Sequence, residues 1–172
     1  MSLWIAGCGG VPVVPPEFQG KIERDVLFRQ VSASPLSYKG KFIVAGGIVL
    51  SVKLKQDGTR IEILQLPLAS DYEPQGRLID SEGRFLASHR ELLDPATIPI
   101  GTRVTVVGEV TGSTTLMIDE VGYAYPTVAI ESLTIWSPKL LPYWYRSYPY
   151  LGAYWGPYWS PPLWSPHREG KR

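Results

Sequence analysis

The stretch that decides the fold is Phe42-Ile43-Val44-Ala45-Gly46-Gly47-Ile48-Val49-Leu50-Ser51-Val52-Lys53-Leu54. It is rich in β-branched residues, which favour strands, and its central glycines lie where a bulge or sharp bend costs little. Gln56-Asp57-Gly58-Thr59 then gives a strong hairpin-turn signal, and residues 60–66 return as a partner strand that stops at Pro67. A long, bent first strand joined to a second by a tight turn predicts the start of a small barrel.

Three further strands are expected downstream. They are a short strand at residues 83–87, a strand at 102–112 that opens after Gly101, and a last strand at 127–136. In the strand at 102–112, alternation puts Val104, Val106, Gly108 and Val110 on one face. One helical turn is expected at residues 91–95, closed by Pro95. The predicted fold is mainly β: an OB-like, five-stranded barrel with a short helical turn between strands three and four, or alternatively an open sandwich.

The segment before the first strand has a mixed pattern. Ile22, Val26, Leu27 and Val31 fall at near-helical spacing, and residues 32–35 end the pattern. We expect a short helix or an irregular layer between residues 17 and 34.

The composition bounds the class of protein. The 172 residues, with 44% hydrophobic and 19% charged residues, suit one domain with appendages, and 17 Gly and 16 Pro predict many turns and little helix. A single cysteine excludes an internal disulfide framework, and two histidines with one cysteine are too few for a soft-metal site. We therefore expect no metal and no cofactor. The sequence has no run of about 20 apolar residues, so it predicts no membrane-spanning helix.

The charge is divided unevenly along the chain. Residues 137–172 hold five basic residues and one acidic residue, a net charge of +4, whereas residues 1–136 hold 12 basic and 15 acidic residues, a net charge of −3. A mildly acidic body gains nothing from counterion release on phosphate backbones. We therefore expect no nucleic-acid partner.

The only cysteine ends an apolar N-terminal stretch, Leu3-Trp4-Ile5-Ala6-Gly7-Cys8. Ile5, Ala6, Gly7 and Cys8 resemble the lipobox of bacterial lipoproteins, in which the cysteine thiol takes the lipid. On this interpretation residues 1–7 are the remnant of a signal peptide, Cys8 is acylated, and residues 8–16 form a tether to a barrel domain at 17–136. The alternative is a lone thiol in a mobile N-terminus, because no Lys or Arg precedes Lys21 and the apolar run is short.

The C-terminal segment, residues 137–172, is a low-complexity tail dominated by Pro, Tyr and Trp. Tyr and Trp favour membrane interfaces, and an aromatic ribbon of this kind also suits contact with an envelope protein or a glycan. The third interpretation is an extension with biased composition and no partner.

Several sequence blocks follow one another in a specific order between Cys8 and Trp136. They are Tyr38-Lys39-Gly40-Lys41, Gly46-Gly47-Ile48, Leu66-Pro67-Leu68, Gly83-Arg84-Phe85, Leu93-Asp94-Pro95, Gly101-Thr102-Arg103-Val104-Thr105-Val106-Val107-Gly108, Tyr123-Ala124-Tyr125-Pro126 and Leu133-Thr134-Ile135-Trp136. Together they resemble the Slp family of outer-membrane lipoproteins. The resemblance implies a precursor with a signal peptide, lipid on Cys8 and attachment to the outer membrane, in a family linked to starvation or stress. Gly9, rather than the Asp that retains lipoproteins in the inner membrane, agrees with outer-membrane sorting. Ala45 departs from the family, which has Trp before the double glycine.

No constellation of residues points to catalysis. His89 and His167 are isolated, and the carboxylate pairs Asp80/Glu82 and Asp119/Glu120 are typical of solvated turns. Tyr123 and Tyr125 have the chemistry to stack on a sugar, but as flanks of a turn before Pro126 they favour packing. We expect a non-enzymatic outer-membrane lipoprotein whose partners are membrane lipid, through Cys8, and an envelope protein or glycan, through the tail. The competing hypothesis is an unacylated periplasmic OB-like module that binds a glycan or peptide.

Overall fold

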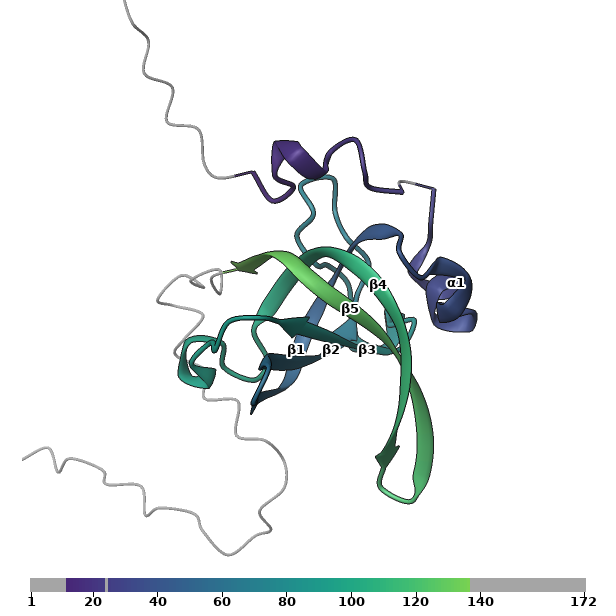
Figure 1. Ribbon diagram of the computed structural model, residues 1–172, viewed down its shortest axis with the longest axis vertical. Coiled ribbons are helices and arrows are strands. Elements are labelled where there is room, and N and C mark those ends of the chain that lie inside the picture. Colours follow the sequence, from purple (N-terminus) through teal and green to yellow (C-terminus); the bar gives the residue numbers. More distant parts are fainter. Residues whose placement is uncertain (1–11, 24, 137–172) are drawn as a thin grey trace, which may run out of the picture. The chain divides into compact units, whose positions relative to one another are not determined.

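The computed structural model describes residues 12–23 and 25–136 (Figure 1). The strands are β1 (Phe42–Lys55), β2 (Gly58–Gln65), β3 (Arg84–His89), β4 (Arg103–Ile118) and β5 (Val121–Trp136). One α-helix, α1 (Phe28–Ala33), and four short 3-10 helices, η1 (Pro16–Phe18), η2 (Pro35–Tyr38), η3 (Leu78–Asp80) and η4 (Pro95–Thr97), complete the described elements. The expectation of a mainly β chain with five strands is confirmed.

The five strands form one sheet that closes in a ring in the order β1-β2-β3-β5-β4. All neighbouring pairs are antiparallel except β3 and β5, which run parallel over a short stretch that pairs Leu86 with Thr127. Strand β1 pairs with β2 along its C-terminal part and with β4 along its N-terminal part, so it joins the two ends of the sheet. The open sandwich is thereby excluded.

The core consists of aliphatic side chains around the aromatic ring of Phe85. Its buried members are Val31, Ile43, Ala45, Val49, Ile61, Ile63, Phe85, Ala87, Ile98, Val104, Val106, Val110, Val128 and Ile130. The alternation expected for the fourth strand is confirmed, since Val104, Val106 and Val110 all belong to this cluster. Helix α1 contributes the fully buried Val31, and Phe28 packs on Phe85 with ring centroids 5.4 Å apart.

The double glycine of β1 allows close approach of backbone rather than a bulge. The register is regular at Gly47 against β2 and at Gly46 and Gly47 against β4, and the bulge lies further along, between Val49 and Ser51. A Cβ on Gly47 would overlap the carbonyl oxygen of Leu64 on β2, and a Cβ on Gly46 would lie 2.7 Å from the carbonyl oxygen of Val104 on β4. These glycines therefore lie where β1 is in contact with strands on both of its edges.

Strands β4 and β5 are longer than expected and continue past the ring as a two-stranded hairpin arm, residues 111–125 (Figure 1). The expectation that the last strand begins at residue 127 and that Tyr123 and Tyr125 flank a turn is wrong, because both tyrosines lie within β5. The turn is instead at Asp119-Glu120, where Asp119 has a φ of 51°. Uninterrupted pairing from Ser113/Pro126 to Ile118/Val121 extends the strands.

The structure corrects the bounds of the two helical segments that we expected. The turn between β3 and β4 is η4, which begins at Pro95 rather than ending there, because proline suits the first helical position and the Asp94 carboxylate accepts a hydrogen bond from the Ala96 N–H at 2.9 Å. Between residues 17 and 34 only residues 28–33 are α-helical. In the part of the chain that the structure describes, no helix has the length and apolar character to cross a bilayer.

Replacing Gly47 with Ala tests the role of close approach in ring closure. We expect Gly47→Ala to lower the free energy of unfolding by about 1–3 kcal/mol, because the added methyl group forces β1 away from the Leu64 backbone. Gly20→Ala is the matched control, since a Cβ there meets no atom within 4 Å. Urea unfolding followed by circular dichroism measures both variants, and equal stabilities would contradict this account of the double glycine.

Candidate functional site

A polar cluster on the outer surface of the ring is built around the carboxylate of Glu62 on β2. Its Oε1 accepts hydrogen bonds from the Arg84 guanidinium and from the Tyr125 hydroxyl, both at 2.9 Å, and its Oε2 accepts one from the Ser51 hydroxyl at 3.2 Å. The four residues come from β1, β2, β3 and β5. The cluster therefore joins the root of the hairpin arm to the outer face of the neighbouring strands.

The members of the cluster change one another's acid–base behaviour. The carboxylate of Glu62 accepts a hydrogen bond from Arg84 and raises the pKa of that guanidinium above its usual value. Burial raises the pKa of the Tyr125 hydroxyl, and the hydrogen bond to Glu62 raises it further. Arg84 therefore stays charged and Tyr125 stays neutral, which suits a structural cluster rather than proton transfer near neutral pH.

The second tyrosine of the arm completes the packing at this root. Tyr123 meets the ring of Tyr125 edge to face, with centroids 4.8 Å apart, and its hydroxyl accepts a hydrogen bond from the Arg84 backbone N–H at 3.0 Å. Tyr125 is only 2% exposed. The face of Tyr125 is thus unavailable for stacking on a sugar, and packing is the role that the geometry supports.

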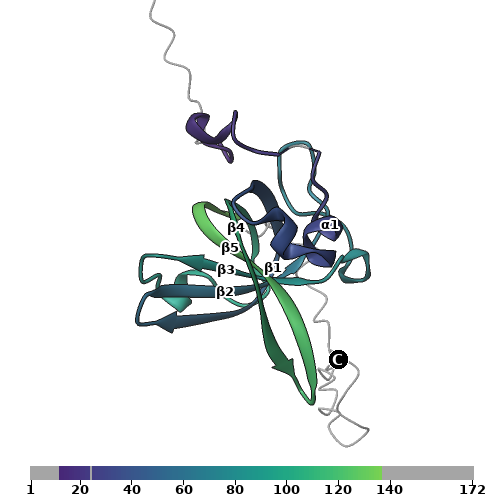
Figure 2. The same ribbon diagram turned by 45° about the vertical axis from the view of Figure 1, so that its right-hand side comes forward.

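Next to the cluster is a small hollow on the outer surface. It is lined by Ser51, Lys53, Arg60, Glu62, Leu86 and Leu116. The residues come from β1, β2, β3 and the arm end of β4, and the hollow has a volume of only about 20 Å³. The β1–β2 hairpin and the hairpin arm leave the ring in different directions (Figure 2). The hollow combines two cations, one engaged carboxylate and two leucines.

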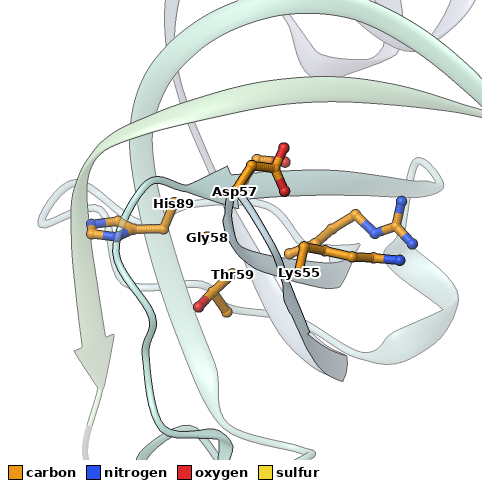
Figure 3. Close-up of a pocket in the computed structure, with 7 residues that line it drawn as sticks. Lys55, Asp57, Gly58, Thr59 and His89 are labelled. Carbon is orange, nitrogen blue, oxygen red and sulfur yellow. The ribbon is translucent and has the colours of Figure 1, made fainter.

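A larger hollow of about 290 Å³ lies at the β1–β2 turn (Figure 3). Its polar side chains do not converge: His89 points to one side of the hairpin and Lys55 to the other (Figure 3). The Thr59 hydroxyl donates to the Glu91 carbonyl at 2.9 Å and accepts from the Leu93 N–H at 2.8 Å, and His89 Nδ1 accepts from the Glu91 N–H at 3.1 Å. These groups order the loop after β3 and form no nucleophile–base pair.

Of the two carboxylate pairs noted in the sequence, Asp80 and Glu82 bind different partners, and Asp119 and Glu120 form the turn of the hairpin arm. Asp80 binds Arg77, and the backbone and side-chain hydrogen bonds from Arg77 lower its pKa, while Glu82 accepts from the Arg29 backbone N–H at 3.0 Å. Within the described residues no three His, Cys, Asp or Glu side chains gather as a metal site would need. Cys8, the lipobox residues Ile5, Ala6 and Gly7, His167 and the tail at 137–172 lie outside the described residues.

The Glu62 cluster was not foreseen from the sequence. Glu62 lies 22 residues from Arg84 and 63 from Tyr125, and no local motif links such positions. The one available signal is alternation: a charged residue at every second position of residues 60–62 marks an outward-facing edge of the strand. That signal identifies the face of the strand on which Glu62 lies, but it does not identify the residues that Glu62 binds.

Tyr125→Phe tests the cluster through its effect on stability. Loss of a hydrogen bond to a carboxylate is expected to lower the free energy of unfolding by about 1.5–3 kcal/mol at pH 7. Because the pKa of Tyr125 is raised in the folded state, its contribution is present below the unfolded value of about 10 and is lost as pH rises through the folded value. Urea unfolding between pH 7 and 11 should show a steeper alkaline decline in the wild type than in Tyr125→Phe.

Tyr123→Phe is the control for this experiment. Its hydroxyl accepts from a neutral backbone N–H, so a smaller loss of about 0.5–1.5 kcal/mol is expected. Equal losses in the two variants, together with parallel pH profiles, would contradict the central role given to Glu62.

Comparison with known proteins identifies the family that this chain resembles. The model of the outer membrane lipoprotein Slp family matches residues 5–165. The uncharacterized lipoprotein YeaY of Escherichia coli is 31% identical over 136 residues, covering 78% of this chain and 68% of that protein. The outer membrane protein Slp of Escherichia coli is 28% identical over 170 residues, covering 96% of this chain and 88% of that protein.

Among solved structures, the crystal structure of Schizosaccharomyces pombe Pot1pC bound to ssDNA aligns with a TM-score of 0.29 and 13% identity, covering 60% of this chain and 82% of that one. A TM-score this low supports no conclusion about fold or ligand. The family match extends over most of the chain and includes the residues of the expected lipobox. This chain therefore belongs to the outer membrane lipoprotein Slp family, whose members are lipid-anchored at the outer membrane.

Proposed function

We propose that acyl chains on Cys8 anchor this protein, and that its ring of strands is an OB-like barrel with a non-catalytic binding role in the envelope. The observation that carries the proposal is the family match, which begins at residue 5 and so includes the segment Ile5-Ala6-Gly7-Cys8. Cys8 is the only thiol in the chain and hence the only candidate for lipid attachment through sulfur.

The proposed anchor is strong enough to hold the domain permanently. Each buried CH₂ group contributes about 0.8 kcal/mol, and stable attachment takes two signals where one acyl chain gives only reversible binding. Two or three acyl chains on one cysteine meet that requirement. The described domain then needs no membrane-spanning helix of its own.

The OB-like assignment is supported by strand order and by the arm. The ring order β1-β2-β3-β5-β4 includes one parallel contact, between β3 and β5, and the connection from β4 to β5 is extended into the hairpin arm. OB barrels bind ligands on the face of strands two and three, beside the loops that join strands one and two and strands four and five. The Glu62 cluster, with Glu62 on β2 and Arg84 on β3, supports a site on that face in this protein.

The hydrogen bonds that the charged groups already make favour a binding role over catalysis. On the described surface, the Glu62 carboxylate accepts three hydrogen bonds, and His89 Nδ1 accepts one from the loop after β3. A general acid or base needs a free proton site within reach of a substrate. Glu62 and His89 are therefore engaged in structural hydrogen bonds, which supports a binding role.

Lipid attachment at Cys8 is tested by labelling with palmitate and by membrane fractionation, with the protein expressed from its native locus. The wild type should carry label and sediment at outer-membrane density, and Cys8→Ala should lose both. Ser2→Ala is the control and should behave as the wild type, because it leaves Ile5-Ala6-Gly7-Cys8 intact. An unlabelled, soluble wild type would refute the anchor and favour the unacylated periplasmic module that binds a glycan or peptide.

Sorting between the two membranes is tested by Gly9→Asp. If Gly9 permits transport to the outer membrane, an Asp directly after the acylated cysteine should retain labelled protein at inner-membrane density. Gly10→Asp, with the same charge one residue later, is the control and should leave the outer-membrane density unchanged. Retention of both variants would show a general effect of charge in the tether instead of a signal at position 9.

A further inference from the structure

An apolar hollow of about 290 Å³ lies along the edge of β1, beside the start of α1. Its apolar wall is formed by the segment that leads into α1, by β1 and by the chain after β2, and it includes Val26, Leu27, Phe28, Ala45 and Leu68. Of the described residues that line it, only Gln65 and Glu82 have polar side chains. We call this space the edge hollow.

Gln65 has a side-chain NH₂ group without a partner among the described residues. Its Oε1 accepts a hydrogen bond from the Glu82 backbone N–H at 2.9 Å, and because that N–H can only donate, the contact fixes which end of the amide is the oxygen. Gln65 is only 6% exposed. In the described part of the chain every fully buried side-chain nitrogen or oxygen has a partner, so this NH₂ group is reached from the edge hollow that Gln65 lines. A ligand there meets a donor that is already held in place.

The carboxylate of Glu82 gives the edge hollow a negative charge. Its Oε2 accepts a hydrogen bond from the Arg29 backbone N–H at 3.0 Å, and no ion pair of the described chain includes it. No described Lys, Arg or His lines the edge hollow. A cationic group of a ligand is therefore favoured beside Glu82, and an anionic group is disfavoured.

The edge of β1 adds two backbone groups. The Phe42 carbonyl accepts from the Glu23 N–H at 2.9 Å, and the Gly46 carbonyl accepts from the Leu66 N–H at 2.9 Å. Alternation directs the N–H and C=O of Val44 toward the same edge. The pairing with β2 and the bridge to the N-terminal segment both stop short of Val44, so no described strand pairs with it on that edge. The open edge covers only about three residues, roughly 10 Å of strand, which suits the end of a chain better than a strand that runs through.

We propose that the edge hollow binds the amino-terminal residue of a peptide when that residue has an apolar side chain. The side chain packs among Val26, Phe28 and Leu68, the ammonium group pairs with the Glu82 carboxylate, and the first carbonyl accepts from the Gln65 NH₂ group. The proposal goes beyond the function proposed above, because it assigns a ligand to a place other than the Glu62 cluster. It depends neither on that cluster nor on the anchor.

The size and polarity of the edge hollow select this ligand over others. Its volume is near the lower end of the range of about 300–1,000 Å³ for small-molecule sites, so it accepts one residue of a chain. A free amino acid or a phosphate ester would bring a negative charge next to Glu82, with only neutral donors to meet it. A glycan would place hydroxyl groups against the apolar wall, which leaves them without hydrogen bonds.

The test titrates leucyl-glycyl-glycinamide against the full chain with Cys8→Ala and follows amide chemical shifts. We expect shifts at residues 26–28, 44–46 and 65–68, which line or adjoin the edge hollow. Triglycinamide should bind about tenfold or more weakly, because it buries no leucine side chain. Free leucine should also bind more weakly, since its carboxylate lies near Glu82.

Glu82→Gln tests the pairing with the ammonium group. The variant keeps an oxygen that accepts from the Arg29 N–H and loses only the charge. It should bind leucyl-glycyl-glycinamide about threefold more weakly, whereas the N-acetylated peptide, which has no ammonium group, should bind the variant and the parent equally. Glu91→Gln, the same change at an exposed residue outside the edge hollow, should bind as the parent does.

The apolar wall and the amide are tested by further variants. Leu27→Ser should weaken binding severalfold, whereas Leu92→Ser should not, because Leu92 is 67% exposed and does not line the edge hollow. Gln65→Met keeps the length of the side chain and removes the donor, so it should weaken binding of the free and the acetylated peptide alike. An amide spectrum of each variant establishes that it is folded.

Several outcomes would overturn the proposal. They are the absence of shifts at the edge hollow with millimolar leucyl-glycyl-glycinamide, equal affinity for triglycinamide, and an equal effect of Glu82→Gln on the free and the acetylated peptide. Shifts at the edge hollow with chitobiose but not with the peptide would also overturn it, and would leave a binding role for the barrel with a glycan as the ligand. Because every protein in this test lacks Cys8, failure of palmitate labelling refutes the anchor alone.

Discussion

Closure of the sheet depends on β1 pairing along both of its edges at once, and that pairing depends on the absence of side chains at Gly46 and Gly47. Backbone atoms of β2 and β4 occupy the space that a Cβ would need on either glycine. An edge strand exposes unpaired N–H and C=O groups, and a closed ring removes such edges without covering elements. The aliphatic core can therefore be enclosed by five strands, with α1 packed against it through Val31 and Phe28.

The same closure sets the direction of the hairpin arm. β4 and β5 keep pairing with each other after β1 and β3 have ended their contacts with them, so the arm leaves the ring as a free two-stranded ribbon. The Glu62 cluster holds the root of that ribbon, because one carboxylate receives donors from β1, β3 and β5. Charged hydrogen bonds of this kind are geometrically demanding and orient what they join.

Family membership and geometry support a consistent account of the protein. The chain belongs to a family of outer-membrane lipoproteins, and the polar cluster on its described surface is made of structural hydrogen bonds around Glu62.

The sequence by itself determined the strands, the first hairpin and the family resemblance, because β-branched runs, Asp-Gly turns and ordered motifs are local in the chain. It also identified Val104, Val106 and Val110 as one face. Only the tertiary structure decided the length of the arm, the purpose of the double glycine and the partners of Glu62. Each of these depends on contacts between residues far apart in sequence, such as Glu62 with Tyr125 or Gly47 with Leu64, and local propensity carries no information about which distant strand lies alongside.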